Sequence, residues 1–223
     1  MLLKEVIFLS QREEIIAIAA KEIGYKEYQN NNNKYGVWYG MNNQPWCAMF
    51  VSWCADQVGA LGNNNKSGII PRTAWVPDYQ TYYSAKGLYK PKGSYTPKCG
   101  DIIIYGSNSH VGLVEQVSNG KVITIEGNTS ANGNSSNGDG VYRRTRSLTD
   151  SWIKGYCVPE YEEEQMEIKT VGVKNLDNGK MIEVEAINVA GSNYIKLRDV
   201  EKLFPVTIDW DGKNPTIELN YKQ

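Results

Sequence analysis

Apolar residues recur every three or four positions between Ser10 and Gly24, a spacing typical of an amphipathic helix packed on a core. Ser10 and Glu13 have the spacing of a capping box, and Gly24 suits the C-terminal end of a helix. A helix is therefore predicted over residues 10–24. Its apolar stripe consists of Ile15, Ile16, Ala19, Ala20 and Ile23.

A second helix is predicted to begin at Pro45 and to end at Gly59. Proline suits the first helical position because its missing N–H would be unpaired there. Cys47 would then lie in the first turn of this helix. The aromatic segment before it, residues 34–40, is predicted to be a loop.

Farther along the chain, apolar and polar residues alternate, as they do in half-buried strands. Strands are predicted at 101–105, 110–117 and 122–128, and another at 141–146, while the Gly-, Asn- and Ser-rich residues from 127 to 140 favour a loop. Helices followed by an antiparallel sheet predict an α+β fold.

Two registers compete in the hairpin that turns at Ser118, Asn119 and Gly120. A two-residue Asn119-Gly120 turn places Leu113 and Glu126 on one face. A three-residue turn pairs Gln116 with Val122 and gives one apolar face, formed by Val111, Leu113, Val117, Ile123 and Ile125. The other face then holds His110, Gly112, Glu126 and Asn128. The three-residue turn is preferred because a slip of one residue moves every side chain to the opposite face.

The C-terminal part of the chain is predicted to be separate. Residues 1–159 form the main domain, 160–166 an acidic linker and 167–223 a small α+β domain. Short strands are predicted at 171–173, 181–187 and 206–208, with a further strand beginning at Ile195 and a short helix at 197–204.

Charge is divided unevenly between these parts. Residues 160–223 contain 8 basic and 13 acidic side chains, which leaves 16 of the 24 basic and 12 of the 25 acidic ones for residues 1–159. A basic first part would be attracted to an anionic polymer such as wall teichoic acid, but it lacks the Lys/Arg density of a nucleic-acid binder. The apolar run near the start has four residues, too few for a signal peptide or a membrane span, so a cytosolic product and no membrane partner are expected.

The cysteines and the single histidine narrow the chemistry. One imidazole is too few for a His-rich catalytic zinc site, so neither a metal nor a cofactor is expected. Cys54, Cys99 and Cys157 are interpreted as buried or peripheral thiols. Cys47 differs because the start of a helix carries unpaired N–H groups that stabilise a thiolate.

His110 is the candidate base for Cys47. On the predicted polar face it lies beside Glu126 and Asn128, either of which would orient the imidazole, and a carboxylate would also stabilise its protonated form. The alternatives are a buried free cysteine and a structural histidine at the end of a strand.

Four blocks of residues resemble the cysteine, histidine-dependent amidohydrolase/peptidase (CHAP) family. They are Trp38-Tyr-Gly-Met-Asn-Asn-Gln-Pro-Trp-Cys-Ala-Met-Phe-Val-Ser-Trp-Cys54, Gly100-Asp-Ile-Ile-Ile-Tyr105, Ser109-His-Val-Gly-Leu-Val-Glu115 and Ile123-Thr-Ile-Glu-Gly-Asn128. The resemblance covers residues 10–159 and implies a papain-like fold, with helices packed on an antiparallel sheet, that cleaves peptidoglycan.

The resemblance also implies roles for single residues. Cys47 would be the nucleophile, His110 the base, Glu126 the orienting residue and Asn128 an auxiliary polar residue. Gln44 would form an oxyanion hole with the Cys47 N–H, or else cap the helix. Some members bind calcium through an Asp-rich loop ahead of the cysteine, but residues 30–36 contain no carboxylate here.

Four aromatic residues surround the predicted cleft in the sequence and are candidates for binding a glycan-peptide ligand, with core packing as the alternative. They are Tyr35, Trp38, Tyr39 and Trp46.

The C-terminal unit resembles the small domain named after the N-terminal region of copper amine oxidases. The residues concerned are Asn193-Tyr-Ile-Lys-Leu-Arg-Asp-Val-Glu-Lys-Leu-Phe204 and Val206-Thr-Ile-Asp-Trp-Asp211. No histidine or cysteine follows Cys157, so a copper site is not supported, and the unit is expected to hold the enzyme on the wall. The glutamate codons before Met166 resemble a ribosome-binding site, which predicts a C-terminal fragment that starts at Met166 and associates with the full chain.

The sequence thus predicts a peptidoglycan hydrolase of the phage or prophage endolysin type, held in the host cytoplasm until release to the wall. The bond cut is the N-acetylmuramoyl-L-alanine amide or a peptide bond, and the sequence does not choose between them. Two other classes stay open: a non-catalytic wall-binding protein, and a thiol transferase that acts on proteins.

Overall fold

A computed structural model describes residues 10–131 and 137–162, together with the backbone of five later strands. The chain divides into two compact units, Leu9–Glu163 and one that contains those later strands. The division falls within the segment expected to be a linker, and the domain limits themselves stay a prediction. No helix among the described residues has the length and apolar character needed to span a membrane.

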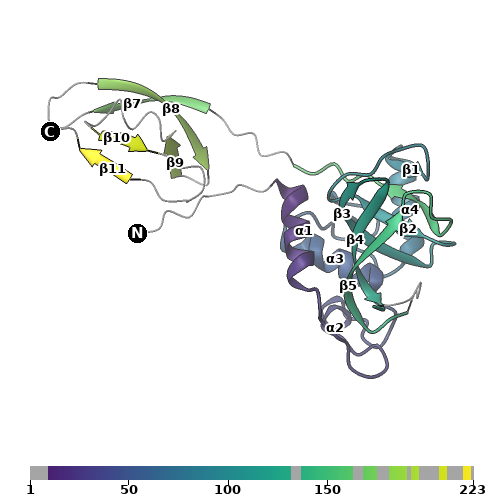
Figure 1. Ribbon diagram of the computed structural model, residues 1–223. Coiled ribbons are helices and arrows are strands. Elements are labelled where there is room, and N and C mark those ends of the chain that lie inside the picture. The colour runs from purple at the N-terminus through teal and green to yellow at the C-terminus, as the bar shows by residue number, and fades with distance from the viewer. Residues whose placement is uncertain are drawn as a thin grey trace. The chain divides into compact units, whose positions relative to one another are not determined.

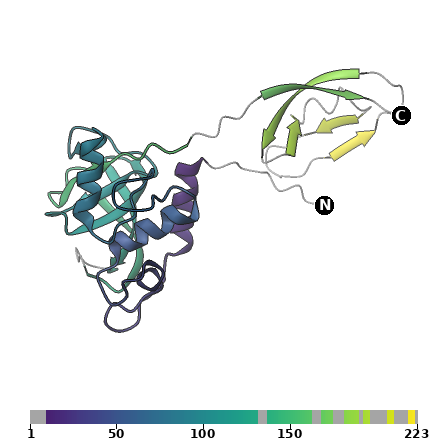
Figure 2. The ribbon, with the colours of Figure 1, turned by 180° about the vertical axis from the view of Figure 1, so that it is seen from behind.

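The larger unit is built around a six-stranded antiparallel sheet in the order β1-β6-β2-β3-β4-β5. Figures 1 and 2 show this sheet from opposite sides, with α1 and α3 next to each other at one face. Helices and sheet together confirm the α+β prediction. The strands are β1 Tyr89–Pro91, β2 Ile102–Tyr105, β3 His110–Ser118, β4 Lys121–Thr129, β5 Gly140–Ser147 and β6 Ile153–Cys157. The helices are α1 Gln11–Lys21, α2 Lys34–Tyr39, α3 Cys47–Gln57 and α4 Val76–Ala85.

The main hydrophobic core lies between the helices and the sheet, where α3 packs on β3 and β4 and α1 packs on α3. Val111, Leu113 and Ile125 contribute to it from the sheet, and Ile15, Ile16 and Ala19 from the predicted stripe of α1. The sequence predicted a polar opposite face, but the sheet has a second cluster there. This cluster consists of Ile103, Tyr105, Val114, Val122, Ile153 and Tyr156.

The hairpin between β3 and β4 has the two-residue turn, so the predicted three-residue turn is wrong. Asn119 and Gly120 have φ angles of 51° and 70°, and Ser118 pairs with Lys121. A β-bulge between Val114 and Gln116 then shifts the pairing by one residue, and Leu113 lies opposite Ile125. The predicted register therefore holds at the His110 end. Near the turn it does not hold, and Val117 packs with the second cluster instead of the main core.

Two further predictions were wrong, the loop at residues 34–40 and the start of the second helix at Pro45. Residues 34–39 form α2, whose start is capped by the Asn33 side chain accepting from the Gly36 N–H at 2.8 Å. Pro45 lies outside α3, which begins at Cys47. The sequence also missed α4 and β1, which precede the segments with clear alternation, and β6, which follows them.

In the smaller unit, β7 Ile168–Lys174, β8 Met181–Val189 and β9 Ser192–Ile195 form a three-stranded antiparallel sheet. β10 Val206–Asp209 pairs with β11 Glu218–Tyr221, a strand that the sequence did not predict. The strands predicted at 171–173, 181–187 and 206–208 fall within β7, β8 and β10. The predicted helix at 197–204 and Met166 lie outside the described residues.

Candidate active site

Cys47 is the first residue of α3, and 4% of its surface is exposed. Trp46, the N-cap residue, makes no capping hydrogen bond with its side chain, so the first turn lacks the usual side-chain acceptor. Gly127 allows β4 to approach this turn closely, because a Cβ atom there would lie 2.6 Å from Phe50 Cβ and 2.7 Å from the Trp46 ring. The sequence therefore places a thiol at an open helix start against the sheet.

Asn128 fixes the backbone just before Cys47. With its amide oriented to satisfy both neighbours, its oxygen accepts from the Trp46 N–H at 3.2 Å and its nitrogen donates to the Gly138 carbonyl at 2.9 Å. Asn128 is fully buried and has a φ angle of 54°, at an irregularity in the pairing of β4 with β5. Its contacts are thus with the start of α3, whereas the sequence placed it on the polar face beside His110.

His110 is the first residue of β3 and pairs with Tyr105, the last residue of β2. Its Nε2 lies 3.0 Å from Glu126 Oε2, and both side chains are fully buried. Gly112 provides the necessary space, because a Cβ atom there would lie 2.6 Å from Glu126 Cγ. The predicted association of His110 with Glu126 is present in the structure.

Two hydroxyl groups hold the other carboxylate oxygen of Glu126. Tyr105 Oη and Thr124 Oγ1 each donate to Oε1 at 2.7 Å. Burial raises the pKa of Tyr105 well above its ordinary value, so this hydroxyl stays a donor. Sequence reasoning missed both residues, although Thr124 shares a strand face with Glu126 through period-two spacing and Tyr105 ends the strand before His110.

The charges of the site favour an ionised pair. Burial lowers the pKa of His110, but hydrogen bonding and charge from Cys47 and Glu126 outweigh it and raise that pKa to about 9. Burial likewise opposes the charge of Glu126, yet its bonds to His110, Thr124 and Tyr105 lower its pKa. Because a carboxylate only accepts, Nε2 of His110 carries the proton that it shares with Glu126. Nδ1 makes no hydrogen bond with any residue that the structure describes and is the nitrogen left for the thiol.

Aromatic rings keep the imidazole in its plane. The Trp152 ring is stacked on Tyr105 at 4.5 Å and on His110 at 5.8 Å, measured between ring centroids. The Arg146 guanidinium covers Trp152 at 4.5 Å. This stack limits rotation of His110 about its side-chain bonds, so the orientation of its two nitrogens is fixed by packing as well as by Glu126.

The family comparison covers the thiol, the imidazole and the two polar residues of β4. Residues 38–128 match the CHAP domain family, and the matched range includes Cys47, His110, Glu126 and Asn128. The chain contains a CHAP domain. This domain implies a cysteine- and histidine-dependent amidohydrolase or peptidase, as the sequence motifs suggested.

Two solved structures are similar to this chain. The wild-type endolysin LysIME-EF1 is 13% identical with a TM-score of 0.42, and the match covers 87% of this chain and 84% of that one. Ly7917 is 14% identical with a TM-score of 0.41, over 82% of this chain and 85% of that one. No curated protein matches the chain by sequence.

The other thiols of the larger unit lack this setting. Burial raises the pKa of Cys54 and of Cys157 well above the ordinary value for a thiol, and it also raises the pKa of the half-buried Cys99. These three cysteines are therefore protonated at neutral pH.

The four aromatic candidates for substrate binding separate into two pairs. Tyr35 and Trp46 are fully buried and stacked at 5.1 Å, and their polar atoms donate to Glu22 and Glu27 at 2.5 Å. Both belong to the core, so the expectation that they bind substrate is wrong. Trp38 and Tyr39 are partly exposed beside Arg72.

Gln44 is exposed in the segment that leads into α3. Because Trp46 is the N-cap residue, the alternative that Gln44 caps the helix is wrong. Its role in an oxyanion hole stays a prediction.

Proposed function

We propose that the chain is a peptidoglycan hydrolase of the endolysin type that cleaves an amide bond with Cys47 as nucleophile. The observation that carries the proposal is the position of Cys47 at the start of α3, where its thiol raises the pKa of a buried imidazole that Glu126 already orients. The CHAP match supports the reaction class.

The reaction proceeds in two halves. In the ionised state that the raised pKa of His110 favours, Nδ1 carries the proton that came from the thiol, and the Cys47 thiolate attacks the carbonyl carbon of the amide. The tetrahedral oxyanion is stabilised by the Cys47 N–H together with Gln44. The imidazolium then protonates the leaving amine as the C–N bond breaks, which leaves a thioester.

Water completes the cycle. His110 removes a proton from the water, whose oxygen attacks the thioester carbonyl. The C–S bond breaks, and the cysteine is restored as the wall fragment leaves with a new carboxyl group. Glu126 remains ionised throughout and stabilises the imidazolium, and Asn128 holds the backbone before Cys47.

The target amide is either the N-acetylmuramoyl-L-alanine bond or a peptide bond of the stem or cross-link. Digestion of purified sacculi followed by mass spectrometry of the muropeptides separates these, since the first cleavage releases stem peptides that begin with alanine. Cys47→Ala is expected to abolish the release of fragments. Equal release by wild type and Cys47→Ala would refute the proposed function.

The smaller unit is proposed to bind the wall polymer, in agreement with its resemblance to a domain of bacterial surface proteins. We also propose that a fragment starting at Met166 is made and associates with the full chain. Mass spectrometry of the expressed protein tests this, with loss of the fragment expected on Met166→Leu. A preparation that contains only the full chain would end this proposal.

A further inference from the structure

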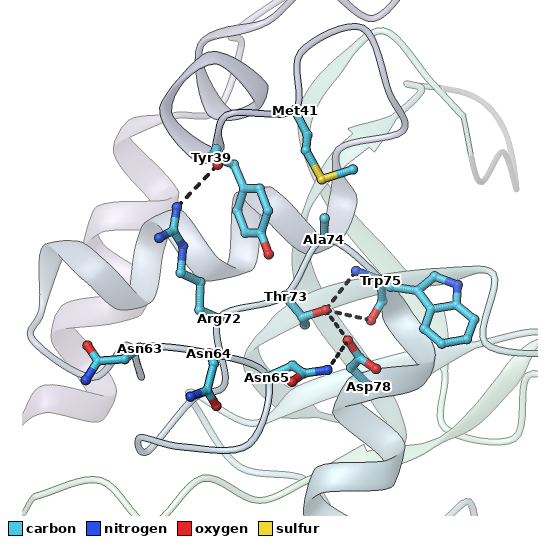
Figure 3. A pocket seen from close by; sticks show the side chains of 10 residues that line it. All are labelled: Tyr39, Met41, Asn63, Asn64, Asn65, Arg72, Thr73, Ala74, Trp75 and Asp78. Atoms are coloured by element: carbon cyan, nitrogen blue, oxygen red, sulfur yellow. Dashed lines mark hydrogen bonds between the residues drawn. The ribbon is translucent and has the colours of Figure 1, made fainter.

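A pocket of about 550 Å³ is lined in part by a loop that is hydrogen-bonded to α3, the helix that begins at Cys47. Figure 3 shows its lining, which comes from the end of α2, the segment after it, two loops and the start of α4. The lining residues are Tyr39, Met41, Asn63, Asn64, Asn65, Arg72, Thr73, Ala74, Trp75 and Asp78. Its volume is within the range of small-ligand sites. We call it the Arg72 pocket.

The pocket is connected to Cys47 through α3. Ser52 Oγ donates to the Thr73 carbonyl at 2.9 Å and accepts from the Thr73 N–H at 3.2 Å. Cys47 precedes Ser52 by five residues, which is about 7.5 Å along a helix axis. From the other side, Met41 is six residues before Cys47, so their Cα atoms are at most about 20 Å apart. A few residues of an extended peptide span this distance.

Among the residues that the structure describes, Arg72 is a fixed cation without an acidic partner. Its guanidinium lies 4.8 Å from the Tyr39 ring centroid and 5.3 Å from that of Trp38, and it donates to the Tyr39 carbonyl at 3.3 Å. Nε is buried and has no hydrogen-bond partner, and none of the ion pairs in residues 10–131 and 137–162 includes Arg72. A guanidinium held by ring stacking, with donors unused, suits a planar carboxylate.

Asp78 does not neutralise Arg72. Its Oδ2 accepts from Thr73 at 2.6 Å and from Asn65 at 3.1 Å. Figure 3 shows these bonds on the side of the pocket away from the Tyr39–Arg72 contact. The pocket thus offers a cation in one part and carboxylate and amide acceptors in another, which suits a peptide with both a carboxylate and N–H groups.

Two apolar side chains are exposed where the Arg72 pocket opens. Trp75 is 66% exposed and Met41 48% exposed. The Trp75 backbone is fixed, since its N–H donates to Thr73 Oγ1 at 2.9 Å. Exposed apolar groups on a fixed backbone provide contact area for a ligand at little conformational cost.

From this geometry we propose that the Arg72 pocket binds a peptidoglycan stem peptide by one of its free carboxylates, so that amidation of the stem weakens recognition. This inference rests on the proposed function for the identity of the polymer. It adds the group that is recognised and names Arg72 as the residue that selects it.

Binding to the full-length Cys47→Ala protein tests the proposal without requiring turnover. The probes are stem pentapeptides with both carboxylates free, with the second residue amidated, with the C-terminus amidated, or with both amidated. Calorimetry is expected to show that at least one singly amidated peptide, and also the doubly amidated one, binds with an affinity about tenfold lower than that of the peptide with both carboxylates free. In Arg72→Gln the free peptide should bind as weakly as the doubly amidated one. Equal affinities for free and doubly amidated peptides, or no binding by any peptide, would overturn the proposal.

Matched variants distinguish binding in the Arg72 pocket from nonspecific attraction to exposed charged or aromatic residues elsewhere on the protein. Lys66→Gln removes one charge from an exposed residue of the adjoining loop and should leave peptide binding unchanged. Trp75→Ala should weaken all four peptides alike, whereas Tyr28→Ala, at an aromatic residue that is 75% exposed and outside the pocket, should not. An equal loss in Lys66→Gln would contradict a specific role of Arg72.

Digestion of sacculi distinguishes two anions that Arg72 could bind, the stem-peptide carboxylate and the phosphate of teichoic acid. Arg72→Gln, with Cys47 intact, should digest teichoic-acid-free sacculi more slowly than the wild type, by the same factor as intact sacculi. A loss confined to intact sacculi would assign Arg72 to teichoic acid phosphate and overturn the proposal. Failure of the wild type to digest any sacculi would refute the proposed function, while the peptide affinities would still report on the pocket.

Discussion

Glu126→Gln isolates the charge that holds His110 protonated. The glutamine oxygen can still accept from Nε2, so the tautomer is retained while the negative charge at 3.0 Å is lost. The pKa of His110 is raised from 6.5 to about 9, which corresponds to about 3 kcal/mol in favour of the imidazolium. Cys47 and Glu126 both contribute to this, and burial opposes it. The variant should therefore bring the pKa of His110 substantially back toward 6.5.

Activity should respond in two ways. The imidazolium must protonate the leaving amine, so kcat falls as the pH rises through the pKa of His110, at about 9 in the wild type. In Glu126→Gln this alkaline decrease should begin at lower pH. A pKa that has returned to about 6.5 leaves about a quarter of His110 protonated at pH 7, which lowers kcat there by about fourfold.

The assay is the initial rate of fragment release from soluble muropeptides between pH 5 and 10. Glu115→Gln is the matched control, because Glu115 is a carboxylate of the neighbouring strand β3 whose partner is Arg143, at 2.6 Å, and not His110. Circular dichroism confirms that both variants fold. The reasoning would be refuted if the alkaline decrease in kcat stayed at about pH 9 in Glu126→Gln, or if Glu115→Gln lost as much kcat as Glu126→Gln.

Three further results are expected. Tyr105→Phe removes a 2.7 Å hydrogen bond to the Glu126 carboxylate, worth about 1.5–3 kcal/mol, so the alkaline limb should move to lower pH, and an unchanged pH profile would contradict a positioning role. Gly112→Ala places a Cβ atom 2.6 Å from Glu126 Cγ, so kcat should fall to near the level of Glu126→Gln, and wild-type kcat would show that the strand adapts. Iodoacetamide should modify Cys47 before the other three cysteines, whose pKa values are raised, and mass spectrometry that finds another site modified first would contradict this.

Much of the active-site pair was predictable because its determinants are local. Cys47 lies two residues after Pro45, at the start of a helix, and His110 and Glu126 belong to strands joined by a two-residue turn. Period-two alternation placed both on one face, although β3 contains a bulge and is not a regular strand. The bulge at residue 115 has no clear signature in the sequence, since a Glu-Gln pair also suits an exposed strand.

The parts that the sequence did not predict depend on contacts between distant segments. β6 lies between β1 and β2 in the sheet, far from both in the chain, and this pairing decides its conformation. Trp152, just before β6, reaches His110 only through that topology. Tyr35 and Trp46 also depend on distant contacts. The sequence alone does not distinguish an aromatic residue in the core from one in a cleft, because the difference lies in which residues surround it in the fold.

The bulge in β3 has a consequence for changes of chain length. Glu115 and Gln116 both lie opposite Ile123, so the strand contains one residue more than regular pairing requires. Deletion of Glu115 would leave Leu113 opposite Ile125 and Val117 opposite Val122, with every side chain on its present face. The strand can therefore lose a residue at this position while His110 keeps its place beside Glu126, whereas a deletion between His110 and Val114 would exchange the two faces at the catalytic end.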